Sequence, residues 1–169
     1  MAPGNKGGKG NKQPRSAPYA PATKKPGSYQ SPAADKQPRR LADPDDPAWR
    51  ERKPHWAFAD VDHDGDWCFD SMETAKLIEV LGKLGNIESM TWKELLAPDN
   101  ILAKQYEVEK MPAHAQKRLT DINRADLTQL VRFQLSGKNR LYGFLVDHVF
   151  HVLWWDPEHQ VWPSKLRHT

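Results

Sequence analysis

The sequence lacks the features that define several large classes of protein. It contains a single cysteine, Cys68, among 169 residues, which excludes an internal disulfide, a cysteine-built zinc site and a Cys-x-x-Cys redox pair. No apolar run approaches the ~20 residues that span a bilayer, and no apolar stretch near the N-terminus resembles a signal peptide. These absences predict a cytoplasmic protein that makes no membrane contact.

Sequence motifs for cofactors and common hydrolases are also missing. The chain has no Walker loop, no Gly-x-Gly-x-x-Gly, no Gly-x-Ser-x-Gly and no His-Glu-x-x-His. His148 and His151 lie three residues apart, but no nearby cysteine completes a zinc set. We therefore expect no cofactor and no zinc, so that any chemistry comes from His, Asp, Glu, Arg, Lys or Tyr side chains.

Charge is distributed unevenly along the chain. Residues 1–42 contain nine basic side chains and one acidic side chain, with seven of the 14 prolines and five of the 10 glycines. The other 127 residues carry 16 basic and 21 acidic side chains, all seven tryptophans and all five phenylalanines. A segment so poor in large apolar residues cannot bury enough surface to offset the entropy of ordering. We predict a disordered basic tail over residues 1–45 and a single domain over residues 46–169.

The basic tail has a composition suited to polyanions. Its cations can pair with phosphates of RNA or DNA, and the candidates for this contact are Lys24, Lys25, Arg39 and Arg40. Lysine and glycine alternate there without a helical period, so such contact would be electrostatic and blind to nucleotide sequence. The alternative is a solubilising leader.

Two strand-like segments flank an acidic turn early in the domain. Residues 55–59 and 67–69 surround Asp64-Gly65, a turn signal that predicts a β-hairpin. Residues 60–66 also open like a calcium loop, with alternating carboxylates and a glycine, although the closing glutamate is missing. A hairpin turn and a weak divalent-ion site are therefore both open.

Capping signals predict several short helices. Asp70 or Ser71 is expected to cap a helix ending near Gly85, and Thr91 begins a capping box before a short helix that Pro98 stops. Residues 99–112 show no clean period, so we expect a loop with at most a helical turn. Further helices are expected over residues 112–119 and 126–130.

The clearest pattern in the chain lies between residues 131 and 155. Apolar and polar residues alternate over 131–136, residues 137–139 form a turn, and residues 140–146 run back. Asp147-His148 then turns the chain again into residues 149–155. This pattern predicts a three-stranded antiparallel meander packed by helices, and the fold class is α+β.

Four polar side chains of this region form a candidate catalytic set. Arg140, Tyr142 and His151 fall on adjacent strands of the expected meander, and His159 follows the third strand. Together they could bind a phosphate and move its proton, whereas each taken singly fits an ordinary structural role. Arg132 and Lys138 are further candidates for contact with a nucleic acid.

The stretch from Val131 to His159 resembles the C-terminal half of the RelE/ParE-like toxin superfamily. The resemblance covers ~30 residues and rests on a strand reaching a short turn, an arginine followed by an aromatic residue, and a last strand with a histidine at its tip. The stretch Leu153-Trp-Trp-Asp-Pro-Glu-His159 also resembles the ending of a group of uncharacterised bacterial proteins. Both resemblances imply a bacterial cytoplasmic origin.

The toxin resemblance implies metal-independent cleavage of messenger RNA on the ribosome, held in check by an antitoxin protein. Arg140 would hold the phosphate, Tyr142 would stack or donate, and His159 or His151 would exchange protons. Asp156 and Glu158 stand where such toxins carry cations, which leaves a fold without catalysis open.

Two functions therefore follow from the sequence. The first is an RNA-directed protein of RelE-like architecture that acts as an endoribonuclease. The alternative is a non-catalytic interaction module with a Trp-rich surface for a protein partner and a basic tail for a polyanion.

Overall fold

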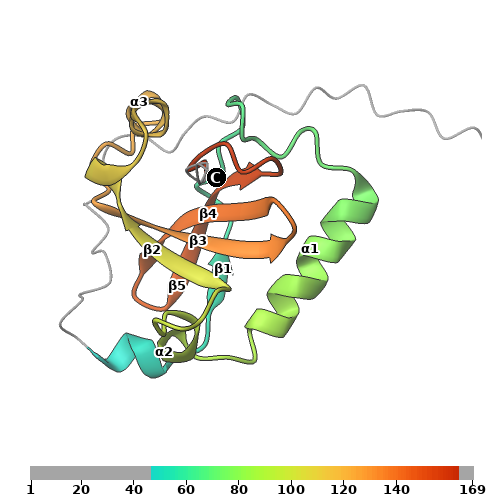
Figure 1. Cartoon of the computed structure of the whole chain (residues 1–169), viewed down its shortest axis with the longest axis vertical. Coiled ribbons are helices and arrows are strands. Elements are labelled where there is room, and N and C mark those ends of the chain that lie inside the picture. Colours follow the sequence, from blue (N-terminus) through green and yellow to red (C-terminus); the bar gives the residue numbers. More distant parts are fainter. Residues whose placement is uncertain (1–46, 164–169) are drawn as a thin grey trace, which may run out of the picture. The chain divides into compact units, whose positions relative to one another are not determined.

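A five-stranded sheet forms the centre of residues 47–163, the part of the chain that the computed structural model describes (Figure 1). The predicted tail over residues 1–45 lies outside these residues. The α+β class is confirmed. The elements in chain order are η1 (Pro47–Glu51), β1 (His55–Ala57), α1 (Thr74–Ile87), α2 (Trp92–Leu95), β2 (Ala103–Glu107), η2 (Val108–Lys110), α3 (Ala113–Asp121), β3 (Gln129–Ser136), β4 (Asn139–Val146) and β5 (Val149–Asp156).

The predicted meander is the core of the sheet. The strand order is β1-β5-β4-β3-β2, and β3, β4 and β5 pair antiparallel across the two expected turns. The antiparallel β2 adds to one edge, while β1 pairs parallel with β5 at the other. The sheet is therefore mixed, because its first strand pairs with its last.

The predicted hairpin after residue 55 is wrong. Residues 67–69 form no strand, and the segment after β1 instead runs beside β5. Asp62 N–H donates to the Leu153 carbonyl at 3.0 Å, and Trp155 N–H donates to the Trp67 carbonyl at 2.8 Å. This segment forms its backbone hydrogen bonds with the free edge of β5. Its two halves therefore do not pair with each other across the Asp64-Gly65 turn.

Helices cover both faces of the sheet. On one face, Val80, Leu84 and Ile87 of α1 and Trp92 of α2 pack into a buried cluster with strand residues such as Phe133. On the other face, α3 contributes a second cluster. It contains Ala115, Leu119, Tyr142, Phe144, Leu153 and Trp154. No helix among residues 47–163 has the length and apolarity to cross a membrane.

Helix α1 differs from its predicted form at both ends. It begins at Thr74 after Glu73, which makes no side-chain capping bond, so the predicted caps Asp70 and Ser71 are wrong. It continues through Gly85 to Ile87 because Ile87 is buried in the core. The helix expected over 112–119 is confirmed as α3.

Two segments between α2 and β3 were misassigned from sequence. The expected loop over residues 99–112 contains strand β2 as well as the helical turn η2, and the expected helix over 126–130 is absent. Only Ala103 of β2 is buried, so this edge strand has no alternating apolar signal. Leu130 faces the α3 cluster from β3, which is why the chain is already extended there.

The capping box of α2 is confirmed. The Thr91 hydroxyl accepts from Glu94 N–H, and the Glu94 carboxylate accepts from Thr91 N–H at 2.7 Å. We expect Thr91→Ala to lower the free energy of unfolding by about 1 kcal/mol, because an N–H at the start of the helix loses its partner. Urea denaturation measures this change. Thr74→Ala is the control, since the exposed Thr74 follows an N-cap that makes no capping bond, and an equal loss in both variants would contradict the prediction.

A β-bulge in β5 changes which side chains share a face. Tyr142 pairs with Trp154 and Gly143 with Val152, so Leu153 is an extra residue in β5. Leu153 and Trp154 consequently both join the α3 cluster. Because the bulge shifts the alternation by one residue, Asp156 lies opposite Arg140 on the same face of the sheet.

Candidate functional site

Two arginines lie next to each other on the face of the sheet that α3 covers. Arg132 on β3 pairs with Tyr142 on β4, and Arg140 is two residues before Tyr142 on the same strand. Side chains two residues apart on a strand share a face, so Arg132, Arg140 and Tyr142 belong to one group. Both arginines are 7% exposed and Tyr142 is completely buried.

Three donors of this group have no hydrogen-bond partner within residues 47–163. They are Arg132 Nε, Arg140 Nε and the Tyr142 hydroxyl. One terminal nitrogen of Arg140 donates to the carbonyls of Gly137 and Asn139, at 2.7 and 3.0 Å, and this fixes its guanidinium near the β3–β4 turn. Buried donors are almost always satisfied in native proteins, so these three are free to donate to an ordered water or to the oxygens of a ligand.

The nearest carboxylate does not supply that acceptor. Asp156 is completely buried, and its two oxygens accept from the backbone N–H groups of Gln160 and Val161, at 2.9 Å each. These bonds close residues 156–161 into a loop that carries His159, whose φ of 62° lies in the left-handed region. The loop therefore contains His159, while Asp156 is engaged by the backbone.

Burial and neighbouring charges set the ionisation of the group. Burial lowers the pKa of Arg140, and the charge of Arg132 adds to the effect. Burial also lowers the pKa of His159, with further contributions from Arg140 and Arg132, so the imidazole is neutral near pH 7. Burial and then the Asp156 charge raise the pKa of Tyr142, which keeps its hydroxyl protonated. The group combines two cations, one hydroxyl donor and one neutral imidazole, a set suited to an anion with several oxygens.

An anion bound to this group should raise the pKa of His159. The depressed pKa in the folded state means that the unfolded chain binds this proton more readily. The stability contributed by His159 is therefore present above pH ~6.5 and is lost as pH falls through the folded pKa. A bound sulfate offsets the charges of Arg132 and Arg140, so we expect the NMR titration of His159 to move to higher pH when sulfate is added. Arg140→Met should abolish the sulfate effect, and an unchanged titration of the unaltered chain would contradict the prediction.

His151 does not belong to this group. Its Nδ1 lies 2.7 Å from an oxygen of Asp60, and its ring stacks on Phe144 with centroids 4.8 Å apart. His151 and Asp156 are five positions apart on β5, which separates them by about 16 Å along the strand. The predicted catalytic role of His151 is therefore not supported by its position, since its contacts are those of a core histidine.

The other residues predicted to contact a nucleic acid lie outside the arginine group. Lys138, in the β3–β4 turn, forms an exposed ion pair with Glu158 at 3.1 Å, so it lies at the loop that carries His159. The remaining nucleic-acid candidates, Lys24, Lys25, Arg39 and Arg40, lie outside the described residues.

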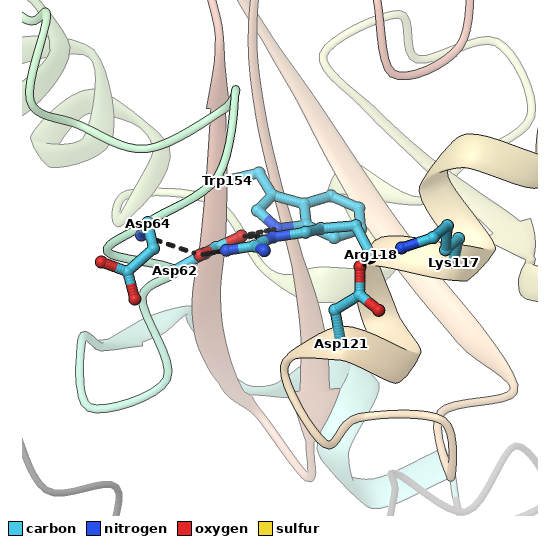
Figure 2. A network of polar contacts seen from close by, with 6 residues as sticks. All are labelled: Asp62, Asp64, Lys117, Arg118, Asp121 and Trp154. Atoms are coloured by element: carbon cyan, nitrogen blue, oxygen red, sulfur yellow. Dashed lines mark hydrogen bonds and ion pairs between the residues drawn. The ribbon is translucent and has the colours of Figure 1, made fainter.

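Arginine side chains pair with Asp60 and Asp62, two carboxylates of the segment that resembles a calcium loop. Asp62 accepts two hydrogen bonds from Arg118 of α3, at 2.6 and 2.5 Å, and one from Trp154 Nε1 at 3.1 Å (Figure 2). Asp60 pairs with Arg124 and with His151. A divalent ion would have to displace two arginine side chains, so these contacts favour a structural role for the loop.

A pocket of about 540 Å³ opens beside this network. Its polar wall includes Lys117 and Asp121, which form an exposed ion pair at 2.7 Å (Figure 2). Trp67 and His114 form its aromatic wall, with ring centroids 5.5 Å apart. Its cations Lys117 and Arg118 are already paired with Asp121 and Asp62, in contrast to the donors of Arg132, Arg140 and Tyr142.

Sequence reasoning missed three residues around the arginine group. Tyr106 of β2 lies beneath Arg132, whose guanidinium carbon is 5.8 Å from the ring centroid. Trp162 packs against Tyr106, and Asp156 organises the loop that carries His159. Tyr106 was missed because its edge strand has no alternating apolar pattern. The orientation of Asp156 was missed because the bulge in β5 changes which side chains share a face.

No protein-family model matches this chain, and neither a curated protein nor a solved structure matches it. The resemblance of residues 131–159 to RelE/ParE-like toxins therefore stays a prediction from the sequence.

Proposed function

We propose that the chain is an RNA-directed protein that holds a backbone phosphate at Arg132, Arg140 and Tyr142. The observation that carries the proposal is the set of three buried donors without partners, two of them on cations. Phosphodiester oxygens carry negative charge and accept several hydrogen bonds, and arginine matches their geometry better than lysine does. The folded part is acidic overall, so this local positive charge is set apart from the rest of the domain.

In its catalytic form, the proposal is metal-independent cleavage of RNA of the RelE-like kind, with the ribosome presenting the message. The neutral imidazole of His159 takes the proton of a ribose 2′-hydroxyl, and the 2′-oxygen forms a bond to the adjacent phosphorus. The bond from phosphorus to the 5′-oxygen breaks, that oxygen takes up a proton from water, and the imidazolium of His159 returns its proton to solvent. The products are a 2′,3′-cyclic phosphate and a 5′-hydroxyl. Arg132 and Arg140 would stabilise the charge on the non-bridging oxygens, and the Tyr142 hydroxyl would donate a hydrogen bond to one of them.

Binding is tested with a fluorescently labelled single-stranded oligonucleotide that carries 2′-deoxy sugars, so that no cleavage occurs. We expect Arg132→Met and Arg140→Met each to weaken binding by the full chain at least tenfold at 0.15 M salt, because each removes a charge-assisted hydrogen bond. Arg50→Met is the matched control, since Arg50 is exposed and lies over the ring of Trp49 in η1. Equal affinity in all four proteins would contradict the proposed phosphate site.

Cleavage is tested separately in a cell-free translation reaction. Purified full-length protein is added, and messenger RNA length is followed for the unaltered chain and for the Arg140→Ala, His159→Ala double variant. Discrete cleavage that is lost in the double variant would support the catalytic form. Intact messenger RNA with the unaltered chain would overturn the catalytic form. The oligonucleotide-binding experiment would then decide whether the protein binds RNA without cleaving it.

A protein-interaction module is the second candidate, and one observation favours it. Leu77, Ile78 and Leu81 of α1 are 43%, 66% and 51% exposed, which is high for large aliphatic side chains. The tryptophans do not form the expected surface, because Trp49, Trp67, Trp92, Trp154 and Trp155 are all buried. An interaction module that uses α1 to bind an antitoxin-like partner would be indifferent to substitution of Arg140 and His159, which separates it from the RNA-directed function.

A further inference from the structure

An aromatic pair borders the arginine group. Tyr106 of β2 and Trp162, six residues after the end of β5, stack with ring centroids 4.7 Å apart and an interplanar angle of 31°. Both side chains are half-buried, so parts of their rings face solvent. The pair therefore joins the free edge of the sheet to the loop that carries His159.

Arg132 connects this pair to the phosphate site. Its guanidinium carbon lies 5.8 Å from the Tyr106 ring centroid, and its unpartnered Nε belongs to the donor group proposed for phosphate. One side chain thus adjoins both an anion site and an aromatic surface. A nucleotide has the same two parts, a negatively charged phosphate and a flat base joined through one sugar.

We infer that Tyr106 and Trp162 form a stacking subsite for an unpaired base whose phosphate is held by Arg132 and Arg140. The inference rests on the proposed function and narrows its ligand to single-stranded RNA. In a duplex the faces of each base are covered by its neighbours, whereas an unpaired base can leave the stack and pack on an aromatic side chain. Every base has a flat face, so this subsite would tolerate any nucleotide sequence.

The test compares three oligonucleotide probes in binding to the full chain at 0.15 M salt. They are a short single strand with 2′-deoxy sugars, the same strand with one abasic position, and a duplex of the same length. We expect the complete single strand to bind about tenfold more tightly than either of the others. Trp162→Leu should lose this preference and bind the abasic strand as the unaltered chain does, whereas Trp162→Phe should retain most of it.

Exposed Phe58 provides a control, because it follows β1 at the sheet edge opposite β2. Phe58→Leu should leave the preference unchanged. Equal affinity of the unaltered chain for the complete and abasic strands would overturn the stacking subsite. If Arg132→Met and Arg140→Met still weakened binding to the abasic strand in that case, the phosphate site would stand without the subsite. If those variants bound the abasic strand as tightly as the unaltered chain, the proposed function itself would fail.

Discussion

Replacing Asp62 with alanine is expected to lower the free energy of unfolding by about 2–3 kcal/mol, because it removes a buried carboxylate that accepts several hydrogen bonds and pairs with a partly exposed arginine. The Asp62 side chain is 1% exposed and accepts hydrogen bonds from Arg118, from Trp154 and from Asp64 N–H (Figure 2). Its loss leaves the Arg118 guanidinium and the Trp154 indole N–H without their acceptor. It also removes the contact that holds the segment after β1 against α3, so the loss of stability includes the loss of this contact.

Urea denaturation of the Asp62→Ala, Arg118→Met and double variants measures this cost. The double variant should lose less stability than the sum of the single ones, because it leaves no uncompensated charge behind. Lys117→Ala is the matched control. It breaks an exposed ion pair on the same helix and should change stability by no more than about 0.5 kcal/mol. A loss below about 1 kcal/mol in Asp62→Ala would contradict the structural role of this carboxylate.

The same carboxylate should make the fold sensitive to acid. Burial opposes the ionisation of Asp62, but hydrogen bonds from Arg118, Asp64 N–H and Trp154 outweigh burial and lower its pKa. The stability that this shift contributes is present above the ordinary pKa near 4 and is lost as pH falls through the lower folded value. Asp62→Ala should therefore flatten the decline in stability as pH falls below about 4.

The second large effect is expected for Gly143→Ala. A Cβ at this position would lie 2.1 Å from the His151 carbonyl oxygen and 2.6 Å from Cζ of Phe150, which is closer than atoms can approach. Gly143 lies at the bulge where β4 and β5 change register, so relief would require the backbones of two central strands to move. We expect a loss of about 3 kcal/mol or more, measured by thermal and urea denaturation.

Gly82 serves as the control, because its replacement by alanine is expected to raise stability instead of lowering it. Gly82 lies in the middle of α1, and a Cβ there would meet no atom within 4 Å. Gly82→Ala should raise the free energy of unfolding by about 0.5–1 kcal/mol, because alanine is the better helix former and restricts the unfolded chain. Losses of similar size in both glycine variants would show that the close approach at Gly143 is not the cause.

Local patterns predicted those parts of the fold that depend on neighbouring residues. The meander follows from alternation and two tight turns, and the Thr91 capping box lies within four residues. The parallel pairing of β1 with β5 depends on residues at opposite ends of the domain, so a local turn signal at Asp64-Gly65 led to the wrong partner. Leu77 and Leu81 continue the helical period of α1 but are exposed, because the period does not say how wide the buried face is.

The candidate site was predictable only where its residues follow the alternation of side chains along neighbouring strands. Alternation places Arg140 and Tyr142 on one face of a strand, and the hairpin brings Arg132 beside them. His151 follows the same alternation and was included with them, but it lies near the other end of β5. The unpartnered donors could not be predicted, since they depend on Asp156 being engaged by backbone groups in the loop after the strand.

The parallel edge strand has a consequence for how the chain folds. Residues that pair between β1 and β5 are separated by about 90 residues, whereas β3, β4 and β5 are joined by the shortest of turns. The meander can therefore form early, and β1 can join only after β5 has been made. Until then Trp56 of β1, which later packs against the core, has no partner strand, so a growing chain exposes it on the ribosome. Translation speed and chaperone supply should thus affect the yield of this protein more than that of a domain whose first strand pairs with its second.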